Sequence, residues 1–150
     1  VFWMLSQASL SLGEIGRYIP YLAFVIPAFS GLRLAKFNID ERQTTSFIGM
    51  PVPAHALFWA SIGYAFHSAI PVDSIGFIAG TIVAAILFSS LLVSEVPMFS
   101  LKVKSLAWKG NELRYILVAG AVVFVTLFGV LGIAGTVILY ITLSFFNKRR

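Results

Sequence analysis

Three polar side chains near the end of an apolar run could bind an anionic group. They are Arg33, Lys36 and Asn38, within the stretch "GLRLAKFNID". Arg33 and Lys36 are three residues apart, so a helix would carry them on one face. Arginine offers a planar fork that can bind phosphate through two hydrogen bonds, and lysine offers a mobile positive charge. The alternative is that both cations merely extend to water from a helix end, and the residue types alone favour neither interpretation.

The other ionisable residues form no recognisable catalytic set. His55 and His67 are twelve residues apart with no carboxylate near them on the same run, so we expect packing or interfacial histidines and no metal site. Glu95 ends a later apolar run, and we expect it to pair with a neighbouring lysine. The chain has no cysteine, paired carboxylates, glycine-rich phosphate loop or Ser-His-Asp set. The sequence therefore predicts no catalytic and no metal-binding residue within these 150 positions.

The elements that carry these residues are predicted by composition. Hydrophobic residues make up 59% of the chain and charged residues 11%, whereas a soluble domain has about 25% charged residues. This composition is typical of an integral membrane protein. The net charge of +5 comes from basic residues scattered between apolar runs, a pattern that reports membrane orientation and does not indicate a nucleic-acid surface.

Four apolar runs are long enough to cross a bilayer, which needs about 20 residues per helix. The last run is too long for one crossing and has glycines near its middle, which predict a hairpin of two short helices. In the first run, Pro20 and Pro27 predict a kink. The opening residues "VFWMLSQASL" are typical of the end of an earlier helix. We therefore expect one domain over residues 1–150, an all-α polytopic membrane helix bundle of about five transmembrane helices plus the end of a preceding one; the runs cover residues 18–37, 53–70, 75–96 and 115–146.

The basic residues support this layout. Among the eleven lysines and arginines, Arg17 alone would lie on the opposite side of the membrane from the rest. The positive-inside rule makes the basic side cytoplasmic. Within the runs, Gly76, Gly80 and Ala84 are spaced four apart, which predicts close helix packing. The segment 100–110 alternates lysine with apolar residues around Trp108, as expected for a segment in the headgroup region.

Two stretches carry a family resemblance. "GLRLAKFNID" followed by "SFIGMPVPAHA" resembles the segment R-L-A-[RK]-F-N … F-x-G-[LM]-P-x-P-A of bacterial phosphatidylserine synthases, which belong to the CDP-alcohol phosphatidyltransferase family. "VPMFSLKVKSLAWK" is similar to the later cytoplasmic loop of those enzymes. The resemblance covers most of the chain.

The resemblance implies transfer of the phosphatidyl group of CDP-diacylglycerol to L-serine, with release of CMP. It also implies a divalent cation, Mg²⁺ or Mn²⁺, held by the aspartates of a D-G-x-x-A-R signature that this sequence lacks. In the family that signature lies just upstream of a segment like "VFWMLSQ", so the resemblance predicts that the metal ligands precede Val1 and that residues 1–150 alone are inactive. Arg33, Lys36 and Asn38 fall within the matching motif and are the expected substrate-binding residues.

The expected partners are CDP-diacylglycerol, L-serine, membrane lipids and a second copy of the chain, without nucleic acid. The expected location is the bacterial cytoplasmic membrane, with the basic loops and the C-terminus in the cytoplasm. Two alternatives remain open: a sibling enzyme with another acceptor alcohol, such as glycerol phosphate or inositol, and a non-enzymatic membrane or transport subunit. Spans that are nearly free of charge, with polar residues at the interface, favour headgroup chemistry over transport.

Overall fold

The computed structural model describes residues 1–10, 12–39, 47–67, 74–99, 108 and 110–147, and these are mainly helical. The expectation of an all-α fold is confirmed at this level, with the addition of two very short paired strands. In chain order the elements are α1 (Phe2–Ala8), α2 (Gly13–Tyr18), the 3₁₀ helix η1 (Ile19–Phe24), α3 (Val25–Ile39), β1 (Phe47–Ile48), α4 (Val52–Ala65), α5 (Ile75–Val93), β2 (Pro97–Met98), α6 (Glu112–Phe128) and α7 (Leu131–Asn147).

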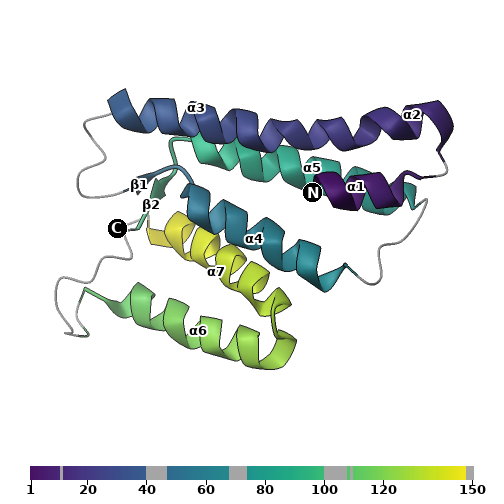
Figure 1. Cartoon of the computed structure of the whole chain (residues 1–150). Helices are drawn as coiled ribbons and strands as arrows, with labels where there is room; N and C mark the ends of the chain where they lie inside the picture. Colours follow the sequence, from purple (N-terminus) through teal and green to yellow (C-terminus); the bar gives the residue numbers. More distant parts are fainter. Residues whose placement is uncertain (11, 40–46, 68–73, 100–107, 109, 148–150) are drawn as a thin grey trace.

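The first predicted run is part of a longer rod. Helices α2, η1 and α3 follow one another without a break from Gly13 to Ile39 (Figure 1). Pro20 lies at the start of the 3₁₀ segment, where its missing N–H and fixed φ disturb the α-helical ladder. Where the sequence predicts a kink at Pro20, the structure has a local change from α-helix to 3₁₀ helix. Pro27 falls in the first turn of α3, where proline is well tolerated.

The second and third runs form α4 and α5, with ends that differ from those expected. Helix α4 begins after Pro51 and ends at the C-cap Phe66, while residues 68–70 of the predicted span lie outside the described residues. At the start of α5, the Ser74 hydroxyl accepts a hydrogen bond from the Phe77 N–H, a typical N-cap. Helix α5 ends at Val93 instead of the predicted Val96, because the following residues turn away to pair with β1.

The predicted hairpin at the end of the chain is confirmed. Helices α6 and α7 meet at Gly129, which has a φ of 57° that disfavours other residues. Gly132 then lies against the α6 backbone, and a Cβ there would overlap the backbone of Phe124. Gly132 therefore allows the two helices to approach closely.

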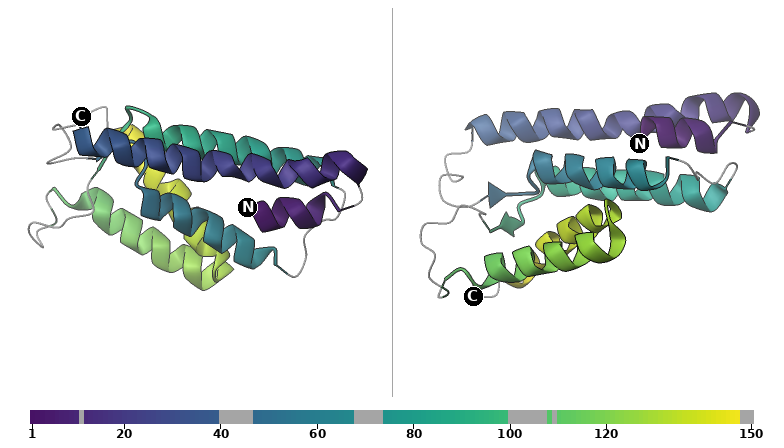
Figure 2. Two further views of the ribbon diagram at one scale, coloured as in Figure 1. Left: turned by 45° about the horizontal axis from the view of Figure 1, so that its top comes forward. Right: turned by 60° about the horizontal axis from the view of Figure 1, so that its bottom comes forward.

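The helices form three layers (Figure 2). The α2–α3 rod makes one layer, α4 and α5 the middle one, and the α6–α7 hairpin the third; α3 packs on α5, and α4 packs on both α5 and α7. The main hydrophobic core lies between these layers. Its buried members come from four helices and both sides of the strand pair; they include Met50, Phe58, Trp59, Ala85, Leu92, Met98, Leu117 and Tyr140.

Two helical stretches are long and apolar enough to cross a membrane, as judged from length and composition: residues Gly13–Ile39 and Ile75–Val93. Large apolar side chains are also widely exposed, and in α6 only Leu117 is buried. Gly76 and Gly80 on α5 are exposed too, so within the described chain they do not make the close helix contact that their spacing predicts. A large exposed apolar surface is costly in water and is expected where lipid or another chain covers it.

Candidate functional site

Arg33 and Lys36 continue the packed face of α3. Phe29, one turn before Arg33, and Ile26, two turns before it, pack against the main core. The spacing of three, four and three residues then brings Arg33 and Lys36 onto the same stripe, at the end where α3 meets the last turn of α5. The predicted pairing of these two cations on one helix face is therefore observed, and the stripe changes from apolar to basic as it reaches the helix end.

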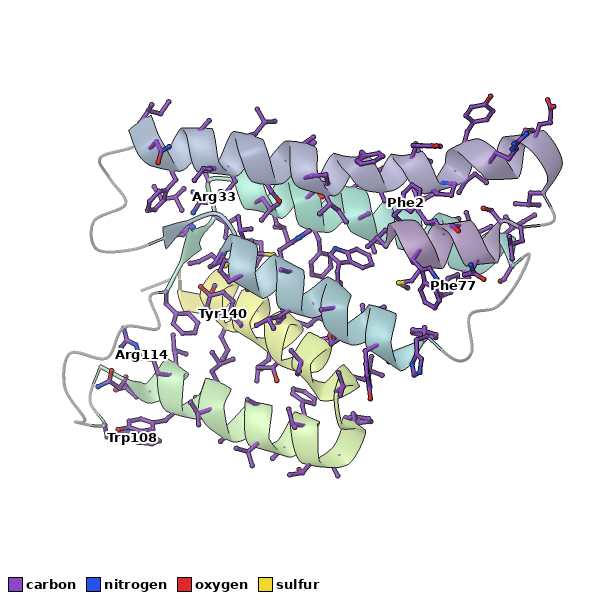
Figure 3. All side chains as sticks on the ribbon, viewed as in Figure 1. Phe2, Arg33, Phe77, Trp108, Arg114 and Tyr140 are labelled. Atoms are coloured by element: carbon purple, nitrogen blue, oxygen red, sulfur yellow. The ribbon has the colours of Figure 1, made fainter. Side chains whose placement is uncertain are left out.

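Arg33 is buried. Only 4% of the residue is exposed, and its Cζ lies 5.6 Å from the centroid of the Phe37 ring, within cation–π range. Burial at this level is unusual for arginine. In a low-dielectric setting, a guanidinium interacts more strongly with a nearby anion than it would in water. Figure 3 shows Arg33 between α3 and the strand pair.

Lys36 is bound to the end of α5. Its Nζ donates to the Val93 carbonyl at 3.1 Å and lies 3.4 Å from Glu95 Oε1. The prediction that Glu95 pairs with a lysine is confirmed, and the partner is Lys36. The last carbonyls of a helix have no intrahelical partner and carry partial negative charge, so Lys36 satisfies the end of α5 and fixes it to α3.

Asn38 does not join the other two residues. At about 100° per residue, it lies roughly 140° around α3 from Arg33, and its side chain is exposed. Of the three predicted binding residues, the structure brings Arg33 and Lys36 together and leaves Asn38 on a different face. The position of Asn38 limits it to contacts with the surrounding loop or with a ligand in solution.

The strand pair is the feature that sequence reasoning missed. Phe47 pairs with Met98, and Ile48 with Pro97. Just after β1, the Gly49 N–H donates to Val96 O at 2.8 Å, and the Met50 N–H donates at 2.9 Å to Leu91 O in the last turn of α5. The two stretches that carry the family resemblance, about fifty residues apart in sequence, are thus joined beside Lys36 and Glu95. The only hint in the sequence that these two stretches meet was that both resemble the same family.

Gly49 makes this joint possible. Its φ is +79°, and a Cβ there would lie 2.6 Å from Leu92 O and 2.9 Å from Ser94 O. Both the backbone angle and the space therefore require glycine. The "GMPVPA" turn is fixed against the end of α5 by backbone contact, in addition to the stiffness of its prolines.

His55 is a packing residue, one of the two roles expected for the histidines, and His67 is exposed. His55 is 2% exposed and lies against the rings of Trp59 and Phe88, each at a centroid distance of 6.5 Å. His67 is exposed at the other end of α4, with Nδ1 2.6 Å from Tyr64 O. Among the described residues, no three histidine or carboxylate side chains gather where they could hold a metal ion.

The described cations divide as the sequence predicts. Arg33 and Arg114 lie at the same end of the bundle (Figure 3), and Lys36 is one turn beyond Arg33 on α3. Arg17 is exposed on α2 at the opposite end of the rod. The other basic residues fall outside the described part of the chain. Comparison with protein-family models, curated proteins and solved structures finds no match to this chain.

Proposed function

We propose that this chain is the acceptor-side part of a membrane phosphatidyltransferase that transfers the phosphatidyl group of CDP-diacylglycerol to L-serine and releases CMP. One observation carries the proposal. The two stretches that resemble phosphatidylserine synthases meet in the β1–β2 pair, directly beside the basic end of α3. A substrate site built from both stretches would require them to lie close together, and the strand pair brings them together.

In this proposal Arg33 binds the substrate anion, either a phosphate or the carboxylate of serine. Its burial and planar donors suit a bidentate contact with a poorly hydrated anion. Lys36 adds positive charge next to it while its ammonium holds the end of α5. Asn38, on the exposed face, contacts the loop or the amine of the incoming alcohol.

The wider fold supports a polytopic membrane arrangement of about five spans. Helices α6 and α7 each have 17 residues, which is roughly 25 Å of helix, and α6 is apolar on nearly all sides. A helix that is apolar all round is typical of a membrane span. The basic ends of the helices then lie on the cytoplasmic side, where CDP-diacylglycerol and serine are available.

The described residues do not fit the divalent cation that the resemblance implies, because they contain no suitable group of carboxylates or histidines. The role proposed for this chain is therefore limited to holding and orienting the substrates. In this proposal, residues near Arg33 bind the substrates. The metal ligands of the reaction belong to the D-G-x-x-A-R signature.

The test is serine-dependent release of CMP from CDP-diacylglycerol in the presence of Mg²⁺ or Mn²⁺. The chain is expressed alone and fused behind a membrane segment that carries the D-G-x-x-A-R signature, with an intact phosphatidylserine synthase as the positive control. We expect activity from the fusion and none from residues 1–150 alone. Glycerol 3-phosphate and inositol replace serine in parallel reactions.

The outcomes separate the alternatives. Activity with glycerol 3-phosphate or inositol but not serine would assign the chain to a sibling enzyme. A folded, membrane-inserted fusion that is inactive with every acceptor would favour the non-enzymatic alternative. Turnover by residues 1–150 alone would mean that the catalytic centre lies within this chain.

A further inference from the structure

A second site candidate lies at the start of α6, remote from Arg33. Here a cavity of about 660 Å³ opens between the beginning of α6 and the end of α7. Its lining combines the polar residues Asn111, Glu112 and Arg114 with the apolar residues Phe99, Ile116 and Phe146. Its volume is within the range of small-molecule sites, about 300–1,000 Å³.

The polar lining includes an oriented cation. Arg114 Nη1 donates to the Gly110 carbonyl at 3.0 Å and to Asn111 Oδ1 at 2.7 Å. These two bonds fix the direction of the guanidinium. The Glu112 carboxylate accepts from the Gly110 N–H at 3.0 Å, which directs one of its oxygens to the loop backbone. Helix α6 begins at Glu112, so the positive end of its dipole adds to the potential here.

Part of the apolar lining is fixed by α7. The Tyr140 hydroxyl donates to the Phe99 carbonyl at 3.1 Å, and the two rings pack edge to face with centroids 5.0 Å apart. Phe99 is therefore held where it lines the cavity. Ile116 and Phe146 are 46% and 64% exposed. A cavity lined by both apolar groups and an oriented cation matches a molecule that has a charged head and a hydrocarbon body.

An aromatic pair stands beside the cavity. Trp108 stacks on Tyr115 with ring centroids 5.2 Å apart and an angle of 10° between the planes, and Trp108 is exposed. Tryptophan and tyrosine gather at the headgroup level of a bilayer. In Figure 3, Trp108 and Arg114 lie at the same end of α6. An exposed aromatic pair at this end of α6 is what a headgroup-level position would require.

We infer that this cavity binds a membrane phospholipid with an anionic headgroup. The phosphodiester lies against Arg114, and the glycerol and first acyl carbons lie over Phe99, Ile116 and Phe146. In the sequence, Lys102, Lys104 and Lys109 precede Arg114, which favours an anionic lipid over a neutral one. The inference does not depend on phosphatidyl transfer, since it concerns binding at the α6–α7 hairpin and does not involve Arg33.

The experiment measures bound lipid by native mass spectrometry of the full chain, purified in mild detergent. Phosphatidylglycerol and phosphatidylcholine with identical acyl chains are supplied as an equal mixture, and inorganic phosphate is added in a parallel titration. The variants are Arg114→Gln, which removes the cation, and Ile116→Trp, which adds bulk to the apolar lining. Arg17→Gln is the matched control, because it removes one exposed positive charge at the opposite end.

For the wild type we expect one phosphatidylglycerol molecule to be retained in preference to phosphatidylcholine. Loss of a charged hydrogen bond should weaken phosphatidylglycerol binding in Arg114→Gln about tenfold. Ile116→Trp should reduce retention of both lipids, and Arg17→Gln should behave as wild type. Circular dichroism checks that each variant keeps its helical content.

Three results would overturn the inference. Folded Arg114→Gln and Ile116→Trp variants could retain phosphatidylglycerol as the wild type does. Arg17→Gln could lose the lipid as completely as Arg114→Gln, which would indicate a general effect of charge. Inorganic phosphate could displace the lipid completely at millimolar concentration, which would assign the cavity to a soluble phosphate compound.

Discussion

Arg33 is the residue whose surroundings depart most from a simple helix end. A cation that only extends to water would be exposed, as Arg17 is, whereas Arg33 is buried and its guanidinium lies near the Phe37 ring. Burying a charge is costly unless the protein supplies compensating contacts. This difference between the two arginines weighs against the interpretation of Arg33 as a plain interfacial residue.

The substitution Arg33→Lys tests whether the planar fork matters. In the active fusion described above, we expect kcat/KM for serine-dependent transfer to fall at least about tenfold, which is roughly 1.4 kcal/mol, because lysine keeps the charge but loses the bidentate contact. Steady-state kinetics of CMP release measure the change. Arg17→Lys is the control and should leave kcat/KM unchanged. Normal kinetics in Arg33→Lys would reduce Arg33 to a structural cation.

Gly49 allows a second prediction at the residue scale. In Gly49→Ala, the new Cβ would meet the Leu92 and Ser94 carbonyls in a backbone conformation that alanine disfavours. We expect the thermal unfolding midpoint in detergent to fall by about 5 °C or more. Gly31→Ala is the matched control, because a Cβ at Gly31 meets nothing within 4 Å and alanine suits a helix better than glycine. Equal midpoints in the two variants would contradict the role of Gly49.

At the scale of elements, α3 and α5 are joined at one end by the contacts of Lys36 with Val93 and Glu95. The ammonium joins a carbonyl at the end of α5 to the side chain of Glu95. The side chains of Lys36 and Glu95 are 31% and 69% exposed, so water and salt weaken the ion pair. The hydrogen bond to the Val93 carbonyl is the more sheltered part of this connection.

A double-mutant cycle separates these two contributions. We expect Lys36→Gln to lower the free energy of unfolding more than Glu95→Gln does, because only Lys36→Gln removes the ammonium from Val93 O. The coupling energy between the two positions should be below about 1 kcal/mol and should shrink in high salt. Denaturant unfolding in detergent measures all four proteins. A larger, salt-insensitive coupling would mean that Glu95 is the main partner of Lys36.

At the scale of the whole molecule, the described ends of the helices separate into a basic end and an opposite end. Asn38 and Trp108 lie at the basic end, and Glu14 and His67 at the other (Figures 1 and 3). All four residues are exposed. If the layers cross a bilayer, these pairs of residues face opposite compartments.

Single cysteines test this topology cleanly, since the chain has none of its own. Cysteines at Asn38 and Trp108 should react with an impermeant maleimide only from the cytoplasmic side of sealed vesicles, because basic segments stay in the cytoplasm. Cysteines at Glu14 and His67 should react only from the outside. Labelling of the cysteines at positions 38 and 67 from the same side of the vesicles would contradict the proposed arrangement of spans.

The sequence by itself determined the features that depend on local physics. Apolar runs and their lengths predict α3, α5 and the α6–α7 hairpin, and glycines near the middle of the last run predict the turn that the structure has at Gly129. The position of Glu95 at the end of an apolar run also predicts its pairing with a lysine, but not which lysine. Each of these depends on neighbouring residues, on helix periodicity or on the cost of exposing polar groups, all of which can be read from a short window.

Only the tertiary structure decided which distant residues meet. It joins residues 47–50 to residues 91–98, buries Arg33 while it exposes Asn38, and chooses Lys36 as the partner of Glu95. It also selects Gly132 as the site of close helix packing and leaves Gly76 and Gly80 exposed. The physical reason is that these outcomes depend on how helices far apart in sequence pack face to face. The same local pattern of small or charged residues is compatible with several packings, and the contacts between layers select one.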